Sequence, residues 1–205
     1  MPEIYIFGGC NGSGKTTFAT TFLSALPGVE FVNADIMAAD LNPRNVDAVA
    51  IQASRLMLER LKVLSTRNID FAFESTHQAK LGKSSKTTIC ATRCAARTFA
   101  RFLKECKSKG YRINLVYVWL ESAELAVARV AKRVESGGHN IPTDTIIRRY
   151  ERGRKNFLEL YSLIADRWIV YDNSKQRQKI AEKPLNQPAI VYQQQIWQQI
   201  ITDRL

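Results

Sequence analysis

The sequence predicts an α/β fold in which a central parallel sheet of about five strands carries helices on both faces. Five short apolar runs, each typical of a buried strand, occupy residues 4–7, 29–32, 69–73, 113–120 and 168–171. Helical stretches of ten residues or more separate most of them, which indicates parallel βαβ units. With 205 residues, the chain is expected to form a single domain spanning 1–205.

Most of the predicted helices begin or end at a recognisable signal. The helix over 15–26 stops at Pro27 and Gly28, and the helix over 98–107 stops at Gly110. A third is predicted over 46–64. A Gly-Gly turn at 137–138 separates a helix over 124–134 from another that begins near residue 143. Apolar residues spaced four apart at 196, 197, 200 and 201 predict a closing amphipathic helix over about 190–203.

The composition excludes several classes of protein. Thirty Lys and Arg against nineteen Asp and Glu give a net charge of +11, which favours anionic partners such as nucleotides or phosphorylated metabolites. No apolar run approaches the ~18 residues of a membrane-spanning helix. The first residues lack the pattern of a secretion signal, so we expect the cytoplasm. Four cysteines without metal-ligand spacing, together with only two histidines, argue against a zinc site and indicate idle thiols.

Residues 9–16 (GCNGSGKT) match the phosphate-loop motif G-x-x-x-x-G-K-[ST] in full. The motif follows a predicted strand and opens a predicted helix, which is the context that its chemistry needs. Backbone N–H groups of the loop and the positive end of the helix bind phosphates, the lysine reaches the β- and γ-phosphates, and the hydroxyl after it ligates Mg²⁺. ATP and Mg²⁺ are therefore the expected cofactors. The predicted nucleotide-binding residues are Gly9, Asn11, Gly12, Ser13, Gly14, Lys15, Thr16 and Thr17.

Acidic residues follow the second and third predicted strands, at the edge of the sheet where ligands of parallel sheets bind. Asp35 is the candidate catalytic base, which would accept the proton of an attacking hydroxyl. The alternative is that Asp35 caps the helix after it. Glu74 would ligate Mg²⁺ together with Thr16 or hold a substrate hydroxyl, and its alternative is a surface acid. Asp40 and Asp47 compete with Asp35 but lie further from the strand end.

A basic segment at about 129–155 predicts a lid over the nucleotide. It holds eight Lys and Arg against three acids, and the Gly-Gly turn within it could serve as a hinge. Arginine suits the oxygens of a phosphoryl group in transfer. Arg133 and Arg149 are the candidates for closing on the γ-phosphate, with Arg148 a near-equal competitor. The alternative is a solvated helix pair, and a structural role is favoured for His139.

Three of these segments resemble the bacterial zeta-toxin-like P-loop kinases, more narrowly their short stand-alone members. The segments are residues 33–35 (NAD), residues 73–76 (FEST), and residues 129–142 (RVAKRVESGGHNIP) with 148–150 (RRY). The resemblance runs from about residue 3 to residue 174. It implies a three-layer P-loop kinase fold with a helical lid. It also implies an enzyme that uses ATP and Mg²⁺ to phosphorylate the sugar 3′-hydroxyl of UDP-N-acetylglucosamine or a related nucleotide sugar.

The resemblance also assigns roles to residues of this chain. The family's catalytic base corresponds to Asp35, its phosphate-binding lysine to Lys15, and its acid after the third strand to Glu74. The lid arginines correspond to Arg133 and to Arg148 or Arg149. Residues 172–174 take the place where the family approaches the adenine. The substrate-binding residues expected on this basis are Glu74, Thr76 and Arg148.

One segment departs from the family pattern. Short relatives pass from the Glu-Ser-Thr element almost directly into the next helix, whereas a basic insertion at about 77–97 intervenes here, with no acid before Glu105. It is a substrate clamp, an RNA-binding patch or a disordered insertion. Two other functions therefore stay open beside the small-molecule kinase, which are a kinase of RNA ends or nucleotides and a non-catalytic nucleotide-binding switch. A protein partner of the antitoxin type also stays open.

Overall fold

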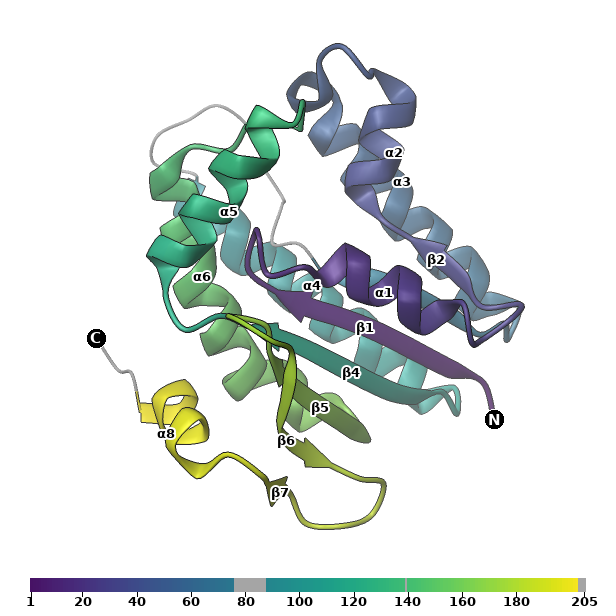
Figure 1. Ribbon diagram of the computed structural model, residues 1–205. Helices are drawn as coiled ribbons and strands as arrows, with labels where there is room; N and C mark the ends of the chain where they lie inside the picture. The colour runs from purple at the N-terminus through teal and green to yellow at the C-terminus, as the bar shows by residue number, and fades with distance from the viewer. Residues whose placement is uncertain (76–87, 139, 203–205) are drawn as a thin grey trace.

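Figure 1 shows the computed structural model, which describes residues 1–75, 88–138 and 140–202. Side chains are described throughout these ranges except at residues 75 and 88–96. The predicted substrate residue Thr76, residues 77–87 of the predicted insertion and His139 lie outside the described residues.

Seven strands form one sheet in the order β2-β3-β1-β4-β5-β6-β7. The first five are parallel, and they are β1 (Glu3–Gly9), β2 (Glu30–Val32), β3 (Phe71–Ser75), β4 (Arg112–Trp119) and β5 (Arg167–Asp172). The predicted α/β fold with a mostly parallel sheet is therefore confirmed. The five parallel strands match the expected number. Two further strands, β6 (Gln178–Lys183) and β7 (Ile190–Val191), add an antiparallel edge that was not predicted.

Helices cover both faces of the sheet, and the alternation of side chains along the strands explains how. On β1, Ile4 and Ile6 point into one core, which packs against α3 (Val46–Thr66) and α4 (Thr88–Ser108). Phe7 points to the opposite face and packs against Phe18 of α1 (Lys15–Leu23). Successive strand residues face opposite sides, so one strand contributes to both cores. Figure 1 shows α1 and α4 on opposite sides of β1.

The lid predicted over 129–155 consists of α5 (Ala123–Glu135) and α6 (Thr143–Asn156). A third apolar cluster joins both helices to the phosphate loop, since Val130 of α5 and Ile146 of α6 pack with Cys10 and Leu120. After α6 the chain continues as a π-helix, η1 (Phe157–Tyr161), and one further turn, α7 (Ser162–Ile164). The lid helices therefore rest directly on the loop that they are expected to cover.

Several predicted boundaries need correction. A short helix, α2 (Ala34–Leu41), follows β2 and was expected only in the alternative in which Asp35 caps it. Helix α4 begins at Thr88 rather than residue 98, so part of the predicted insertion is helical. The closing helix α8 (Gln194–Thr202) begins four residues later than expected because residues 190–191 pair with β6 as β7. Within the described part of the chain, no helix combines the length and apolarity needed to cross a membrane.

Candidate active site

The loop at residues 9–14 joins β1 to α1, and its glycines are required by geometry. Gly12 and Gly14 have φ angles of 75° and 84°, which residues with side chains rarely adopt. A β-carbon on Gly12 would also lie 2.9 Å from the backbone oxygen of Ala126, because α5 passes close to the loop. Helix α1 begins directly after the loop and turns its positive end toward it. The backbone here is therefore shaped for phosphate groups.

Lys15 lies buried at the base of this loop, with 5% of its side chain exposed. Its ammonium donates a hydrogen bond of 2.8 Å to the backbone oxygen of Cys10 and lies 3.5 Å from a carboxylate oxygen of Glu74. Nearby, the buried hydroxyl of Ser13 has no hydrogen-bond partner among the described residues. Buried hydroxyl groups are normally satisfied. A bound phosphate oxygen would accept a hydrogen bond there, so the residues of the loop fit a nucleotide.

Glu74 lies near the end of β3 and connects three elements. Its carboxylate accepts hydrogen bonds of 2.7 Å from the Thr16 hydroxyl and 2.9 Å from the Asn33 amide. Only 3% of the side chain is exposed, so the alternative reading as a surface acid is wrong. The Thr16 hydroxyl and the Glu74 carboxylate are oxygen ligands of the kind that Mg²⁺ prefers, and they meet beside the phosphate loop. These two residues fit a divalent cation.

Asp35 lies in the first turn of α2, directly after β2. The residue that caps this helix is Asn33, whose side-chain oxygen accepts a hydrogen bond of 2.8 Å from the backbone N–H of Asp35. The alternative in which Asp35 is the cap is therefore wrong. Asn33 was not among the predicted site residues. The sequence signal for Asn33 was an Asn two positions before the acid Asp35. The Asn33 side chain orients both Asp35 and Glu74.

The surroundings of Asp35 raise the pKa of its carboxyl group. Desolvation by nearby protein atoms is the largest cause, although the side chain keeps contact with solvent, and the negative charge of Glu74 adds to it. The positive charges of Lys15, Arg149 and Arg133 act in the opposite direction. Asp35 therefore shares one electrostatic environment with the phosphate-loop lysine and two lid arginines. A raised pKa makes a carboxylate a better proton acceptor.

Arg149, rather than Arg148, reaches the phosphate loop from the lid. Its guanidinium donates a hydrogen bond of 3.1 Å to the side-chain oxygen of Asn11. Desolvation lowers the pKa of Arg149, whereas the charges of Asp35 and Asp47 raise it. Arg148 instead contacts Thr145 on its own helix, at 3.4 Å. The two arginines are neighbours on α6 and differ in direction by about 100°, so Arg149 is the one placed over the loop.

Arg133 approaches the same region from the last turn of α5. It lines a cleft together with Asp35. The turn after α5 folds back tightly onto this arginine. A β-carbon on Gly138 would lie only 2.6 Å from Cγ and 2.8 Å from the backbone oxygen of Arg133. A glycine is therefore needed at 138 for the turn to close. The predicted pair Arg133 and Arg149 thus comes from two different lid helices.

The loop after β5 borders the other side of the phosphate loop. The Asn173 side chain donates a hydrogen bond of 2.9 Å to the backbone oxygen of Ser13. A guanidinium nitrogen of Arg129 donates one of 2.9 Å to the backbone oxygen of Ser174. Arg129 belongs to the predicted lid segment and Asn173 to the predicted adenine-side loop, but neither of these two contacts was predicted. They connect α5, the loop after β5 and the phosphate loop.

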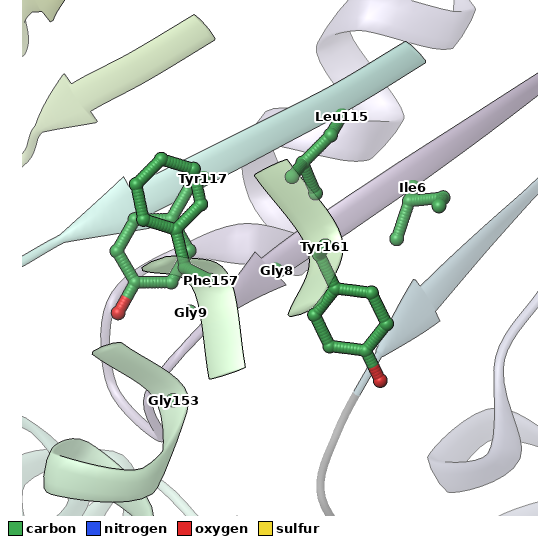
Figure 2. Close-up of a pocket in the computed structure, with 8 residues that line it drawn as sticks. All are labelled: Ile6, Gly8, Gly9, Leu115, Tyr117, Gly153, Phe157 and Tyr161. Carbon is green, nitrogen blue, oxygen red and sulfur yellow. The ribbon is translucent and has the colours of Figure 1, made fainter. Parts of the chain in front are cut away.

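The π-helix η1 packs against the strand that leads into the phosphate loop, as Figure 2 shows. The ring of Phe157 stacks on that of Tyr117, with centroids 4.6 Å apart, beside Gly8 and Gly9. A cavity of about 10 Å³ remains between these groups, which is close to the space of a single water molecule. The cavity is thus a packing defect rather than a ligand site. The stacked rings join the π-helix that continues α6 to β4, the strand next to β1.

The thiols of Cys10 and Cys106 are buried. Burial raises the pKa of each to about 11, so both stay protonated near neutral pH. This agrees with the expectation of idle thiols for these two cysteines. The side chains of Cys90 and Cys94 lie outside the described residues.

A family model described as an AAA domain matches residues 4–160. A protein of Haemophilus influenzae, described only as an uncharacterized protein, is 28% identical over 142 residues, which cover 69% of this chain and 88% of the relative.

Among solved structures, one from the PezAT chromosomal toxin-antitoxin system of Streptococcus pneumoniae has a TM-score of 0.64. It is 16% identical and covers 100% of this chain and 80% of its own. A structure of the Pnkp1/Rnl/Hen1 RNA repair complex has a TM-score of 0.55 and is 18% identical. The match covers 78% of this chain and 46% of the chain in that structure. A putative kinase from Chloroflexus aurantiacus has a TM-score of 0.51 and is 13% identical. The match covers 74% of this chain and 76% of that kinase chain. At such identities the likeness shows a shared fold.

Proposed function

We propose that this chain, which belongs to the AAA domain family and carries a P-loop kinase-like domain, is an ATP- and Mg²⁺-dependent kinase of a small-molecule hydroxyl group. One observation carries the proposal. Asp35 lines a cleft together with Arg133, and the positive charges of Lys15, Arg149 and Arg133, the three cations that a transferred phosphoryl group would contact, all act on its carboxyl group. A proton acceptor beside a phosphate cradle is the arrangement that phosphoryl transfer to an alcohol needs.

Each residue then has a defined task. Lys15 and the loop amides hold the phosphates of ATP, and Arg149 and Arg133 neutralise the charge that develops on the transferred group. Asp35 accepts the proton of the acceptor hydroxyl as its oxygen bonds to the γ-phosphorus. The bond between that phosphorus and the bridging oxygen breaks, and ADP leaves with the electron pair. Positioning and electrostatics account for most of the rate in such transfers.

Mg²⁺ would be held by the hydroxyl of Thr16 and, directly or through water, by Glu74. When bound, it neutralises the phosphate oxygens of ATP. Asn33 keeps the Glu74 carboxylate in place and also caps the helix that presents Asp35. One side chain therefore orients both the metal-binding acid and the base.

For the acceptor we propose a nucleotide sugar such as UDP-N-acetylglucosamine, phosphorylated on its sugar 3′-hydroxyl. Support comes from the resemblance of residues 33–35, 73–76 and 129–142 to zeta-toxin-like kinases. The fold shared with the pneumococcal toxin-antitoxin structure is consistent with that resemblance. The net charge of +11 also favours a polyanionic acceptor such as an RNA end, so RNA is included in the test as the competing acceptor.

The test is to incubate the protein with ATP, Mg²⁺ and a panel of nucleotide sugars, nucleotides and short RNAs, and to identify phosphorylated products by mass spectrometry. We expect a nucleotide sugar to gain one phosphoryl group, and we expect Lys15→Ala to abolish the product. Phosphorylated RNA ends with no sugar product would replace the proposed acceptor. ATP binding without transfer to any member of the panel would favour a nucleotide-binding switch and refute the proposal.

A further inference from the structure

A cleft of about 270 Å³ opens beside Asp35, between the α2–α3 pair and the lid. Asp35 and Asp47 supply its acidic groups, and Arg133 borders it from α5. Figure 1 shows that α2 and α3 stand on one side of the phosphate loop and the lid helices on the other. Nothing in the phosphate loop lines this cleft, so it is separate from the place of the nucleotide.

The charges around the cleft favour a ligand portion without charge. The carboxylates of Asp35 and Asp47 balance the charge of Arg133 within the cleft, and their charges also act on the nearby Arg149. A phosphate group bound here would face two carboxylates at close range. Hydroxyl groups suit the same surroundings, because a carboxylate accepts hydrogen bonds from several of them and a guanidinium donates to their oxygens.

The size of the cleft limits what enters. Its volume is below the roughly 300–1,000 Å³ of sites that enclose drug-sized ligands. Small side chains (Ala38, Ala39 and Ala50) line it and leave the space open. A group of about one sugar ring is small enough to enter, whereas a complete nucleotide sugar has to extend beyond the cleft.

We infer that the cleft binds the uncharged, hydroxyl-bearing end of the acceptor, and that Asp47 determines specificity by accepting hydrogen bonds from the hydroxyls beside the one that is phosphorylated. The inference rests on the proposed function, because it takes Asp35 as the base. Asp47 lies in the first turn of α3, one turn or less from its cap Asn45. An acid at that position also stabilises a helix, so the test has to separate recognition from stability.

The test is a cycle that combines Asp47→Ala with the removal of one sugar hydroxyl from the acceptor. ADP release is measured with UDP-N-acetylglucosamine and with two analogues that lack either the 4-hydroxyl or the 6-hydroxyl of the N-acetylglucosamine unit. We expect Asp47→Ala to raise KM for the acceptor by roughly 10- to 100-fold, the usual worth of a hydrogen bond to a charged group, with KM for ATP unchanged. For one analogue, the rise in KM relative to the intact acceptor should be far smaller in the variant than in the unmodified protein, because its missing hydroxyl is the one that Asp47 binds.

Asp40→Ala is the matched control, since Asp40 is an exposed acid on α2 that does not line the cleft. Ala50→Leu tests the volume, and it should abolish acceptor-dependent ADP release while ATP still binds. If the effects of Asp47→Ala and of every missing hydroxyl on KM, expressed as free energies, are additive, the inference is overturned although the kinase activity stands. If the unmodified protein instead phosphorylates an acceptor whose phosphate adjoins the attacked hydroxyl, the charge argument is overturned. A protein that phosphorylates nothing overturns the proposed function and this inference together.

Discussion

Replacing Glu74 with Gln tests whether its carboxylate holds the phosphate-binding lysine in place. The side chains of Lys15 and Glu74 are 5% and 3% exposed, and their charged atoms are 3.5 Å apart. Removing one partner of a buried ion pair costs about 3–5 kcal/mol because the other charge stays buried. We expect a loss of about 3 kcal/mol in the free energy of unfolding, at the lower end of that range. Lys15 keeps its hydrogen bond to the backbone oxygen of Cys10, which offsets part of the cost.

The assay is urea unfolding of the protein with and without saturating ADP, in the absence of magnesium so that metal binding by Glu74 does not contribute. ADP phosphates supply the negative charge that the variant lacks, so the difference in stability should shrink when ADP is bound. The control is Glu30→Gln, which breaks an exposed pair with Arg60 and should cost about 1 kcal/mol or less. The reasoning fails if Glu74→Gln costs no more than this control, or if ADP leaves its effect unchanged.

Arg149→Lys should lower the rate of phosphoryl transfer by roughly 10²-fold or more with nearly unchanged ATP affinity, because a lysine cannot replace the fork that reaches Asn11; steady-state kinetics with ATP varied checks this. The rate should fall as the pH drops through the raised pKa of Asp35, which must be deprotonated to act as a base, and Arg149→Gln should move that fall to higher pH because it removes a charge that lowers this pKa; the pH dependence of kcat/KM checks both signs. Phe157→Ala should cost about 3–5 kcal/mol of stability, since the ring is buried and stacks on Tyr117; a loss under about 1 kcal/mol in urea unfolding would contradict the packing described for the π-helix.

Much of the fold could be predicted because its signals are local. The five parallel strands are short apolar runs between helices, and the phosphate loop has a motif whose residues are adjacent in the chain. The antiparallel edge was missed for a physical reason. In β6, only Ile180 and Ala181 are buried, and β7 has two residues, so neither shows the pattern of a buried strand. Such strands form because β5 offers a free edge.

The site was predictable where residues follow strand ends and less so where packing decides. Asp35, Lys15 and Glu74 come together because parallel strands end at one edge of the sheet. The choice between Arg148 and Arg149 depended on the rotation of α6, which the adjacent letters of the sequence do not specify. The position of Asp47 beside Asp35 could not be predicted, because it depends on α2, which lies between the two residues. Helix α2 has eight residues, begins at an Asn cap and has too few turns for a clear apolar period.

The most direct test of the account is the rate of a single turnover in Asp35→Asn, measured together with its affinity for ATP. Asn cannot accept the proton of an attacking alcohol, yet it has nearly the same shape. We expect the rate of transfer to fall by roughly 10²- to 10⁴-fold, the usual worth of general-base help, while the dissociation constant for ATP stays nearly unchanged. A fall of less than a few-fold, or a loss of ATP affinity as large as the loss of rate, would contradict the assignment of Asp35 as the base.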